Sequence, residues 1–439
     1  MLKCVSGATK VLSVVAVMSC LWCLACRRAE DSQLRLDILI TNARIFDGNG
    51  TTLHQGSIAI ADGRITSVTD ISVGTPALIQ IDATGMTVMP GLIDTHRHLL
   101  LSLMLDESFA SSPSTEALDR WVEREIPQAL RQYLESGITT VLATADFFPT
   151  IVEIQRRVAR GELLSPRLFV AGAAFTAPDG HPAVTICQAD PWCRAHFAVE
   201  TDDEDTARAK VREQVAAGVD VIKVVYDGSR GAKLDDAVFR AITDEAQRSQ
   251  IPVVVHTLSV EDMIKAVDLG ASRLVHTPVR GGIFGTEASR ALIDAGVPIA
   301  TTISPLAPVA DDTEAVHTPW GEEYTPSTEA LLEQGLSNVR QLWDDGVVVA
   351  FGTDLPRSPS EDLDFEVRTL SDVLSSKEIL QALTRNAAEF MNLAADLGTL
   401  EKGKIADVLI VEGDPLADVS RLADVRVVIK DGVMVVDNR

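Results

Sequence analysis

The sequence predicts an α/β protein, a (β/α)8 TIM barrel with a small β-sandwich domain formed from both termini. Between residues 91 and 393, eight short apolar segments alternate with patterns typical of helices of about 10–20 residues. Residues 36–90 and 394–439 instead show short segments of alternating apolar and polar residues, broken by turn dipeptides. A chain of 439 residues has room for a barrel of about 250 residues and an appended unit.

The first 25 residues predict an export signal that precedes the fold. Two lysines come before an apolar run of 15 residues (11–25), which is shorter than the roughly 20 that a membrane span requires. Ala25 followed by Cys26 resembles a bacterial lipoprotein cleavage site, which implies lipidation of Cys26; Cys20 is the competing site. We therefore expect an exported protein in the bacterial periplasm or at the cell surface, anchored in the membrane by lipid. An uncleaved anchor and plain secretion are the alternatives.

Cysteine content and net charge narrow the possible partners. Four of the six cysteines lie in or directly after the signal, which leaves Cys187 and Cys193. An even pair in an oxidising compartment predicts a disulfide, with two unpaired thiols as the alternative. The net charge of −24 argues against a nucleic-acid partner, because no basic stripe can neutralise phosphates.

The two ends of the chain predict one small sheet domain. LDILITNARIFDG (36–48) and SIAIADGRITSVTD (57–70) are strand-like runs that end in Asp-Gly or polar turns, and ALIQIDATGMTVMPG (77–91) continues the pattern. Residues 404–419 and 424–437 show the same short apolar runs broken by polar turn residues. We expect these strands to form the β-sandwich domain from 36–90 and 394–439.

The middle of the chain predicts the barrel. Unbroken apolar runs are typical of parallel strands that are buried on both faces. A doubly wound open sheet is the alternative, but the first strand is not followed by a glycine-rich dinucleotide fingerprint. The eight expected strands are 91–98, 138–146, 167–175, 220–227, 252–257, 273–277, 298–304 and 347–354.

Polar residues interrupt these apolar segments at or near their carboxyl ends, where barrel enzymes place their chemistry. A single histidine in such a position is more often a core or capping residue than a ligand. A lysine within Val-Ile-Lys-Val-Val is a stronger signal, because a buried ammonium group is costly unless it is paired or neutralised. The candidates are His96, His98, Lys223, His256, His276 and Asp354.

The residue types and their order resemble the amidohydrolase superfamily. The matching features are Asp-Thr-His-Arg-His at 94–98, a lysine on strand 4, single histidines on strands 5 and 6, and Asp354 on strand 8. The flanks MPGLIDTHRH and LGTLEKGKIADVLIVEGDPLAD are similar to those of this superfamily as well. The chain looks most like the branch with imidazolonepropionase-related enzymes and prolidase-type metal-dependent carboxypeptidases.

This resemblance implies a centre of two divalent metal ions, which we expect to be Zn. His96, His98 and Asp354 would hold one ion, His256 and His276 the other, and Lys223 carboxylated by CO2 would bridge them. Asp354 would also act as the catalytic acid–base residue.

The implied reaction is hydrolysis of an amide bond in a small-molecule substrate, by attack of a metal-bridging hydroxide. Dipeptides or N-acyl amino acids are the expected substrates, and lactones, esters or cyclic amides are the alternative. A non-catalytic binding protein is disfavoured because all six ligand positions are filled. A homo-oligomer is compatible with the sequence.

The loops after the strands should determine specificity. His181, in Asp-Gly-His-Pro, matches a Gly-His element of related enzymes, and Tyr226 could emerge at the barrel mouth, so both are expected to contact substrate. His317 is a third candidate, on a long acidic loop after strand 7. That loop could favour cationic substrates, although solvation explains its charge more simply.

Overall fold

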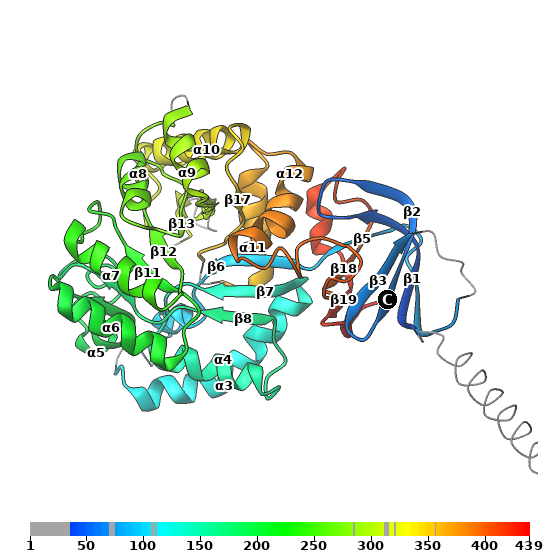
Figure 1. Cartoon of the computed structure of the whole chain (residues 1–439), viewed down its shortest axis with the longest axis horizontal. Coiled ribbons are helices and arrows are strands. Elements are labelled where there is room, and N and C mark those ends of the chain that lie inside the picture. The colour runs from blue at the N-terminus through cyan, green and yellow to red at the C-terminus, as the bar shows by residue number, and fades with distance from the viewer. Residues whose placement is uncertain are drawn as a thin grey trace, which may run out of the picture.

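The computed structural model describes residues 36–69, 75–106, 109, 112–283, 286–310, 316–319, 322–355 and 357–439. The predicted signal, with Cys20 and Cys26, lies outside these residues. Within the described ranges, no helix is long and apolar enough to span a bilayer. Figure 1 shows a barrel on one side and a small β domain on the other, where the first strands lie beside the last.

The small domain is one eight-stranded sheet that encloses its own apolar core. Its strand order is β20-β19-β18-β5-β1-β2-β3, and β4 pairs with β1. Strand β18 connects the two ends of the chain, because it is antiparallel both to β5 and to β19. The strands are β1 (Leu36–Phe46), β2 (Thr52–Ala61), β3 (Arg64–Thr69), β4 (Ala77–Asp82), β5 (Met86–Pro90), β18 (Val408–Glu412), β19 (Val425–Lys430) and β20 (Val433–Asp437).

The barrel strands are short and parallel, as the apolar runs predict. They form a three-stranded sheet, β6-β7-β8, and a seven-stranded sheet, β10-β9-β11-β12-β13-β14-β17. They are β6 (Leu92–Arg97), β7 (Ile138–Ala143), β8 (Arg167–Val170), β9 (Ala174–Thr176), β10 (Ala198–Glu200), β11 (Ile222–Val225), β12 (Val253–His256), β13 (Arg273–Val275), β14 (Ile299–Ala300) and β17 (Val349–Ala350).

Two contacts close these sheets into a barrel. A bridge between Ala171 and Val221 joins the end of β8 to β11. On the other side, Thr95 N donates to Phe351 O, so that the segment after β17 lies beside β6. This closure confirms the predicted (β/α)8 architecture and brings the first and last strands together, with their carboxyl ends at the same rim.

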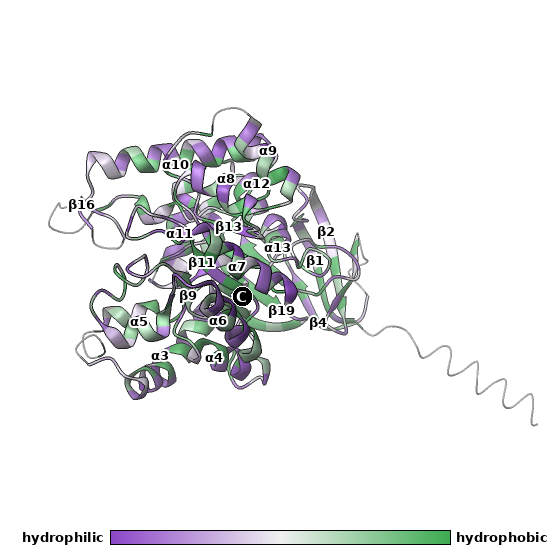
Figure 2. Cartoon of the chain, turned by 60° about the vertical axis from the view of Figure 1, so that its left-hand side comes forward, coloured by the Kyte–Doolittle hydropathy of each residue, from purple (hydrophilic) through white to green (hydrophobic). Residues whose placement is uncertain are grey.

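Amphipathic helices cover the barrel. In Figure 2 they carry hydrophilic and hydrophobic residues together, and their apolar positions join the main core. The helices are α3 (Thr115–Glu135), α4 (Thr150–Ala159), α5 (Pro191–Phe197), α6 (Glu204–Ala217), α7 (Asp236–Arg248), α8 (Val260–Asp268), α9 (Thr286–Ala295), α10 (Pro326–Asp344), α11 (Pro359–Leu370), α12 (Ser376–Gln381) and α13 (Ala387–Phe390).

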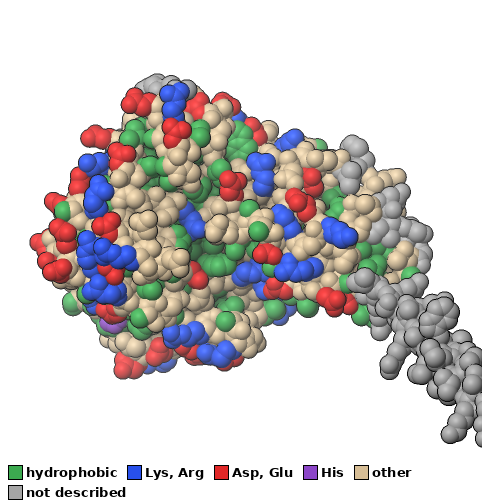
Figure 3. All heavy atoms as spheres, in the orientation of Figure 1, with side chains coloured by type: hydrophobic (Ala, Val, Ile, Leu, Met, Phe, Trp, Pro, Cys, Tyr) green, Lys and Arg blue, Asp and Glu red, His purple; other side chains and the backbone are tan. Residues whose placement is uncertain are grey.

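Two details differ from the prediction. The third predicted strand is divided into β8 and β9, and the loop that follows adds β10, which pairs with β9. The acidic loop contains a small hairpin, β15 (Val309–Ala310) and β16 (Val316–His317), which lies at the end of the molecule away from the β domain (Figure 2). On the face shown in Figure 3, acidic and basic side chains are interspersed.

Candidate metal centre

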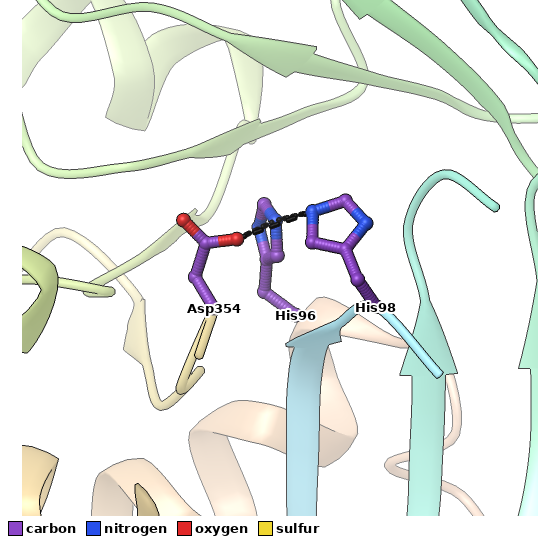
Figure 4. Close-up of side chains that lie close together, drawn as sticks. All are labelled: His96, His98 and Asp354. Atoms are coloured by element: carbon purple, nitrogen blue, oxygen red, sulfur yellow. Dashed lines mark hydrogen bonds and ion pairs between the residues drawn. The ribbon is translucent and has the colours of Figure 1, made fainter. Parts of the chain in front are cut away.

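Three predicted ligands meet above the end of β6 (Figure 4). Asp354 Oδ1 lies 3.1 Å from His96 Nε2 and 3.2 Å from His98 Nε2, and the two imidazole nitrogens are 3.4 Å apart. One ligand atom from each residue lies within 4.8 Å of the others. The period of a strand explains the pair, because positions i and i+2 project from the same face.

Hydrogen bonds orient this cluster. His98 Nδ1 lies 2.5 Å from the carbonyl oxygen of Ala145, so this nitrogen donates and Nε2 keeps its lone pair toward Asp354. The buried carboxylate of Asp94 accepts from His96 N at 3.1 Å, Thr353 N at 3.2 Å and Thr353 Oγ1 at 2.7 Å. It therefore fixes the backbone beside both His96 and Asp354. Burial raises the pKa of Asp94 to about 6.

The close approach of the last strand to the first explains Gly352. A Cβ atom there would lie 2.8 Å from the Cβ of His96. We expect Gly352→Ala to displace His96 and to weaken metal binding by about tenfold or more, as loss of a ligand-orienting contact does. Metal content after dialysis against a graded chelator measures this effect. Gly228→Ala, which faces only the flexible Lys233 side chain, is the control, and equal metal retention in both variants would contradict the prediction.

The other three predicted ligands lie around the same pocket. The rings of His276 and His96 are 4.7 Å apart and those of His256 and His276 are 4.3 Å apart. His276 Nδ1 lies 2.6 Å from Thr302 Oγ1 and 3.6 Å from Asp354 Oδ2. Lys223 projects into the barrel from β11 and is 3% exposed. The structure thus brings all six predicted ligands together.

The backbone is strained at three positions of this site. His276, Thr302 and Asp354 have φ values of +70°, +47° and +54°, in a region that side chains other than glycine rarely adopt. Such strain costs on the order of 1–3 kcal/mol at each residue and persists only where surrounding contacts hold it. Here Glu366 is one such contact, because it accepts hydrogen bonds from Ile303 N and Ser304 N, directly after Thr302.

Burial governs the electrostatics of the centre. It lowers the pKa of Lys223 to about 7, and Asp354 opposes this change only in part. It also lowers the pKa of His96 to about 3 and that of His276 well below its usual range. Burial alone would raise the pKa of Asp354, but His96 and His276 hold it well below its usual range. Neutral imidazoles around an ionised carboxylate have the protonation states that metal binding requires.

The residues present fit a metal centre. His96 Nδ1 and His256 Nε2 are buried and have no hydrogen-bond partner among the residues that the structure describes. Lys223 likewise makes no hydrogen bond or ion pair to a described protein group. Imidazole and carboxylate ligands suit Zn²⁺. Nε2 of His96, Nε2 of His98 and the Asp354 carboxylate face one another, as the ligands of one ion would.

Arg97, between the two histidines, points the other way. It is buried, and its guanidinium contacts the carboxylate of Asp362 and lies 5.7 Å from the Tyr133 ring centroid. The alternation along β6 therefore separates ligands on one face from this cation on the other.

The centre lies in a pocket of about 370 Å³, within the usual range for small-molecule sites. His181, which the sequence analysis expects to contact substrate, lines this pocket, and its ring lies 5.1 Å from that of His256. Two residues that the sequence analysis did not single out, Arg230 and Arg280, line it as well. Each follows a ligand-bearing strand by only a few residues, and this position was the available signal. Apolar side chains complete the walls: Leu101, Ile186, Phe197, Leu258, Val279, Leu306 and Leu331.

The expectation that Tyr226 contacts substrate is corrected by its position. Tyr226 is 1% exposed, and its hydroxyl donates to Asp236 on α7, outside the barrel. Lys223 and Val225 face the pocket, so the two-residue period of β11 turns Tyr226 outward.

The acidic loop contributes differently from the prediction. His317 belongs to the β15–β16 hairpin and is not among the residues that line the pocket, whereas Glu322 from the same loop is. Asp311, Asp312, Glu314 and Trp320 lie outside the described residues. The remaining histidine with a described side chain, His196, stacks on Trp192 at 4.4 Å, away from the centre.

The predicted disulfide between Cys187 and Cys193 is present, with the two Cα atoms 5.3 Å apart. It fastens a loop that supplies a wall of the pocket, including His181, Ile186 and Phe197. Closing so short a loop is worth about 2 kcal/mol of unfolding free energy.

We expect the double variant Cys187→Ser/Cys193→Ser to raise KM several-fold with a smaller change in kcat, because the wall loosens while the ligands stay. Steady-state kinetics and urea unfolding measure both effects. Dithiothreitol should change KM of the parent protein and not of the variant. An unchanged KM in the variant would show that the wall does not depend on this bond.

Comparison with known proteins agrees with this geometry. The amidohydrolase family model matches residues 87–435. The chain is 25% identical over 417 residues to a 5-methylthioadenosine/S-adenosylhomocysteine deaminase of Natronomonas pharaonis, which covers 86% of this chain and 87% of the relative. It is 24% identical over 426 residues to an imidazolonepropionase of Caldanaerobacter subterraneus, with 87% and 93% covered.

Among solved structures, a Xaa-Pro dipeptidase with bound methionine has the same fold, with a TM-score of 0.75 at 24% identity over 90% of this chain and 99% of that chain. The family match spans the barrel, the end of the N-terminal part of the β domain and most of its C-terminal part. The superfamily resemblance predicted from the sequence is therefore confirmed, and the protein belongs to the amidohydrolase family of metal-dependent hydrolases that act on carbon–nitrogen bonds.

Proposed function

We propose that this protein hydrolyses the amide bond of dipeptides or N-acyl amino acids at a centre of two divalent ions. The observation that carries the proposal is a buried lysine without a protein partner among the described residues, in one pocket with four histidines and Asp354. His96, His98 and Asp354 would hold one ion, and His256 and His276 the other. The lowered pKa of Lys223, about 7, leaves about half of its amine neutral at pH 7. This neutral form could add CO2, and the resulting carbamate would serve as a ligand to both ions.

Each side chain has a role that follows from its position. Ions held by these ligands supply Lewis acidity and lower the pKa of a nearby water. Asp354 is ionised and lies among the ligands, so it can accept the proton of the attacking water and deliver it to the leaving nitrogen. His181, on the wall beside His256, is placed to donate to the carbonyl oxygen of the substrate.

The pocket supports a substrate with a free carboxylate. Arg230 and Arg280 line it, and no ion pair joins either one to a carboxylate of the described residues. The only acidic side chains among the described lining residues are Asp354 and Glu322. The apolar wall suits the side chain or acyl group of such a substrate.

We expect Arg230→Gln and Arg280→Gln to raise KM about tenfold for dipeptides and N-acyl amino acids, since a hydrogen bond to a charged group is worth about 1.5–3 kcal/mol. The corresponding C-terminal amides serve as controls, because they lack the charge that the arginines would bind. Equal KM changes for the acid and the amide would contradict carboxylate recognition.

A panel of substrates tests the reaction itself. The zinc-loaded protein is assayed on dipeptides, N-acyl amino acids, lactones and 5′-deoxyadenosine. Turnover of the first two classes supports the proposal. Exclusive turnover of lactones would favour the ester-type alternative. Ammonia release from the nucleoside alone would favour deamination, the activity that the name of the Natronomonas relative states.

We also propose that the protein is exported and held in the membrane by lipid on Cys26. The support is the apolar segment that ends at Ala25 and the disulfide of the folded part, which suits an oxidising compartment. Mass spectrometry of the protein from membranes of a bacterial host tests this. Recovery of an N-terminus upstream of Cys26 without lipid would contradict the proposal.

A further inference from the structure

A second pocket, of about 250 Å³, lies behind the metal centre, against α3. We call it the α3 pocket; it is lined by the outward face of β6, the middle of α3 and the start of α11. His98 lines both this pocket and the barrel pocket, whereas Arg97 lines only the α3 pocket. On the α3 side, Gln128 is exposed and Gln132 is half-buried, so solvent reaches the pocket from this helix.

Two arginines in this pocket share one carboxylate. Arg97 contacts Asp362, and Arg357 Nε donates to Asp362 Oδ1 at 3.3 Å. Asp362 is fully buried and is the carboxylate that both guanidinium groups contact, whereas the buried Asp94 acts on Arg97 without an ion pair to it. Glu125 also lines the pocket, but its carboxylate accepts from Arg124 Nε at 2.5 Å. Asp362 therefore serves both guanidinium groups and does not accept from all of their N–H donors.

The two guanidinium groups also have unused donors. Arg97 Nε and Arg357 Nη2 are buried and have no hydrogen-bond partner in the described part of the chain. Arg97 is 4% exposed, and a buried N–H group without an acceptor costs about 1–3 kcal/mol. Ser358 and Pro359, at the N-terminus of α11, line the same pocket, and the partial positive charge of a helix N-terminus favours an anion.

We propose that the α3 pocket binds a small planar oxyanion, bicarbonate or a short carboxylate. A flat anion with two acceptor oxygens matches the forked donors of guanidinium groups. It would supply acceptors for the unused N–H donors of Arg97 and Arg357.

The bound anion would also support the metal centre. Arg97 Nη1 donates to Thr353 Oγ1 at 3.3 Å, and a guanidinium nitrogen of Arg97 donates to the carbonyl oxygen of Arg357. These contacts enclose the segment that carries Asp354. An anion bound in the α3 pocket would therefore stabilise the loop that carries Asp354 without entering the barrel.

Thermal unfolding of the metal-loaded protein tests the proposal, in buffers of equal ionic strength that contain chloride, acetate, bicarbonate or phosphate. We expect the unfolding temperature to rise to a plateau with acetate and bicarbonate. Arg357→Gln should weaken the binding of the anion by about tenfold or more. Arg368→Gln, an exposed arginine of α11, is the matched control and should keep the parent response. A plateau with phosphate alone would overturn the planar-anion assignment, and a rise that never saturates would overturn the site.

Two further variants locate the anion. Ala129→Leu fills the α3 pocket from a half-buried position and leaves every charge in place, so it should abolish saturation even if Arg357→Gln folds poorly. Arg230→Gln weakens any binding of a carboxylate in the barrel pocket, so the saturable response that this variant keeps is the contribution of the α3 pocket. Broadening of the ¹⁹F signal of trifluoroacetate gives a direct readout in each variant. Loss of the response in Arg230→Gln and its persistence in Ala129→Leu would place the anion at the metals instead.

Discussion

Lys223→Ala is expected to reduce kcat/KM by well over 100-fold. Altering a residue that only orients a ligand costs about 10–100-fold in metal affinity or activity, and Lys223 would be a ligand itself once carboxylated. Its side chain is almost fully buried, and its pKa of about 7 leaves about half of the amine at pH 7 in the neutral form, which reacts with CO2. Alanine leaves a space where the carbamate would lie.

A short carboxylate should restore part of the activity of Lys223→Ala, because it can take the place of the carbamate. Steady-state kinetics with acetate or propionate added measures this rescue, and metal analysis reports the occupancy. Lys265→Ala is the control, since this lysine is exposed on α8 and pairs with Asp236. Full activity of Lys223→Ala without added acid would refute the bridging role.

Asp354→Asn is expected to have an effect of similar size with a different signature. The carboxylate of Asp354 lies within 3.2 Å of both His96 Nε2 and His98 Nε2, and it is the only carboxylate of the described three-residue cluster. Asparagine keeps the shape but loses the charge and the basic oxygen. We expect a loss of more than about 100-fold in kcat, together with retention of less metal after dialysis.

The pattern of rescue separates the two variants. Short carboxylates should not rescue Asp354→Asn, because the amide still fills the position. Asp362→Asn alters the buried carboxylate behind β6. It tests whether the loss of any nearby negative charge is enough to lower kcat and metal content. Normal metal content with unchanged kcat in Asp354→Asn would remove this residue from both of its proposed roles.

Much of the site could be predicted because a residue at the carboxyl end of a barrel strand has a known place in the fold. In a parallel barrel the carboxyl ends of all strands face one rim, so polar residues at the ends of separate apolar runs must converge there. That reasoning placed His96, His256 and Asp354 together before any contact was known. The same two-residue period could have assigned Tyr226 correctly, since it stands three residues after Lys223 and therefore faces the opposite side.

Other parts of the site could not be read from the sequence. Arg230 and Arg280 lie in the loops after β11 and β13, and only the folded course of these loops brings both side chains to one pocket. The left-handed backbone at His276, Thr302 and Asp354 depends on surrounding contacts, since residues other than glycine rarely adopt it and the β-branched Thr302 least readily. The sharing of Asp362 by Arg97 and Arg357 likewise depends on how α11 packs against β6.

The sequence by itself determined the barrel, the two-ended β domain and the identity of the six candidate ligands, because periodicity and residue chemistry are local properties. Only the tertiary structure decided which nitrogen of His98 faces Asp354, which wall the disulfide fastens and which cations line the pocket. These features depend on contacts between residues far apart in the chain. Such contacts exist only after the barrel has closed.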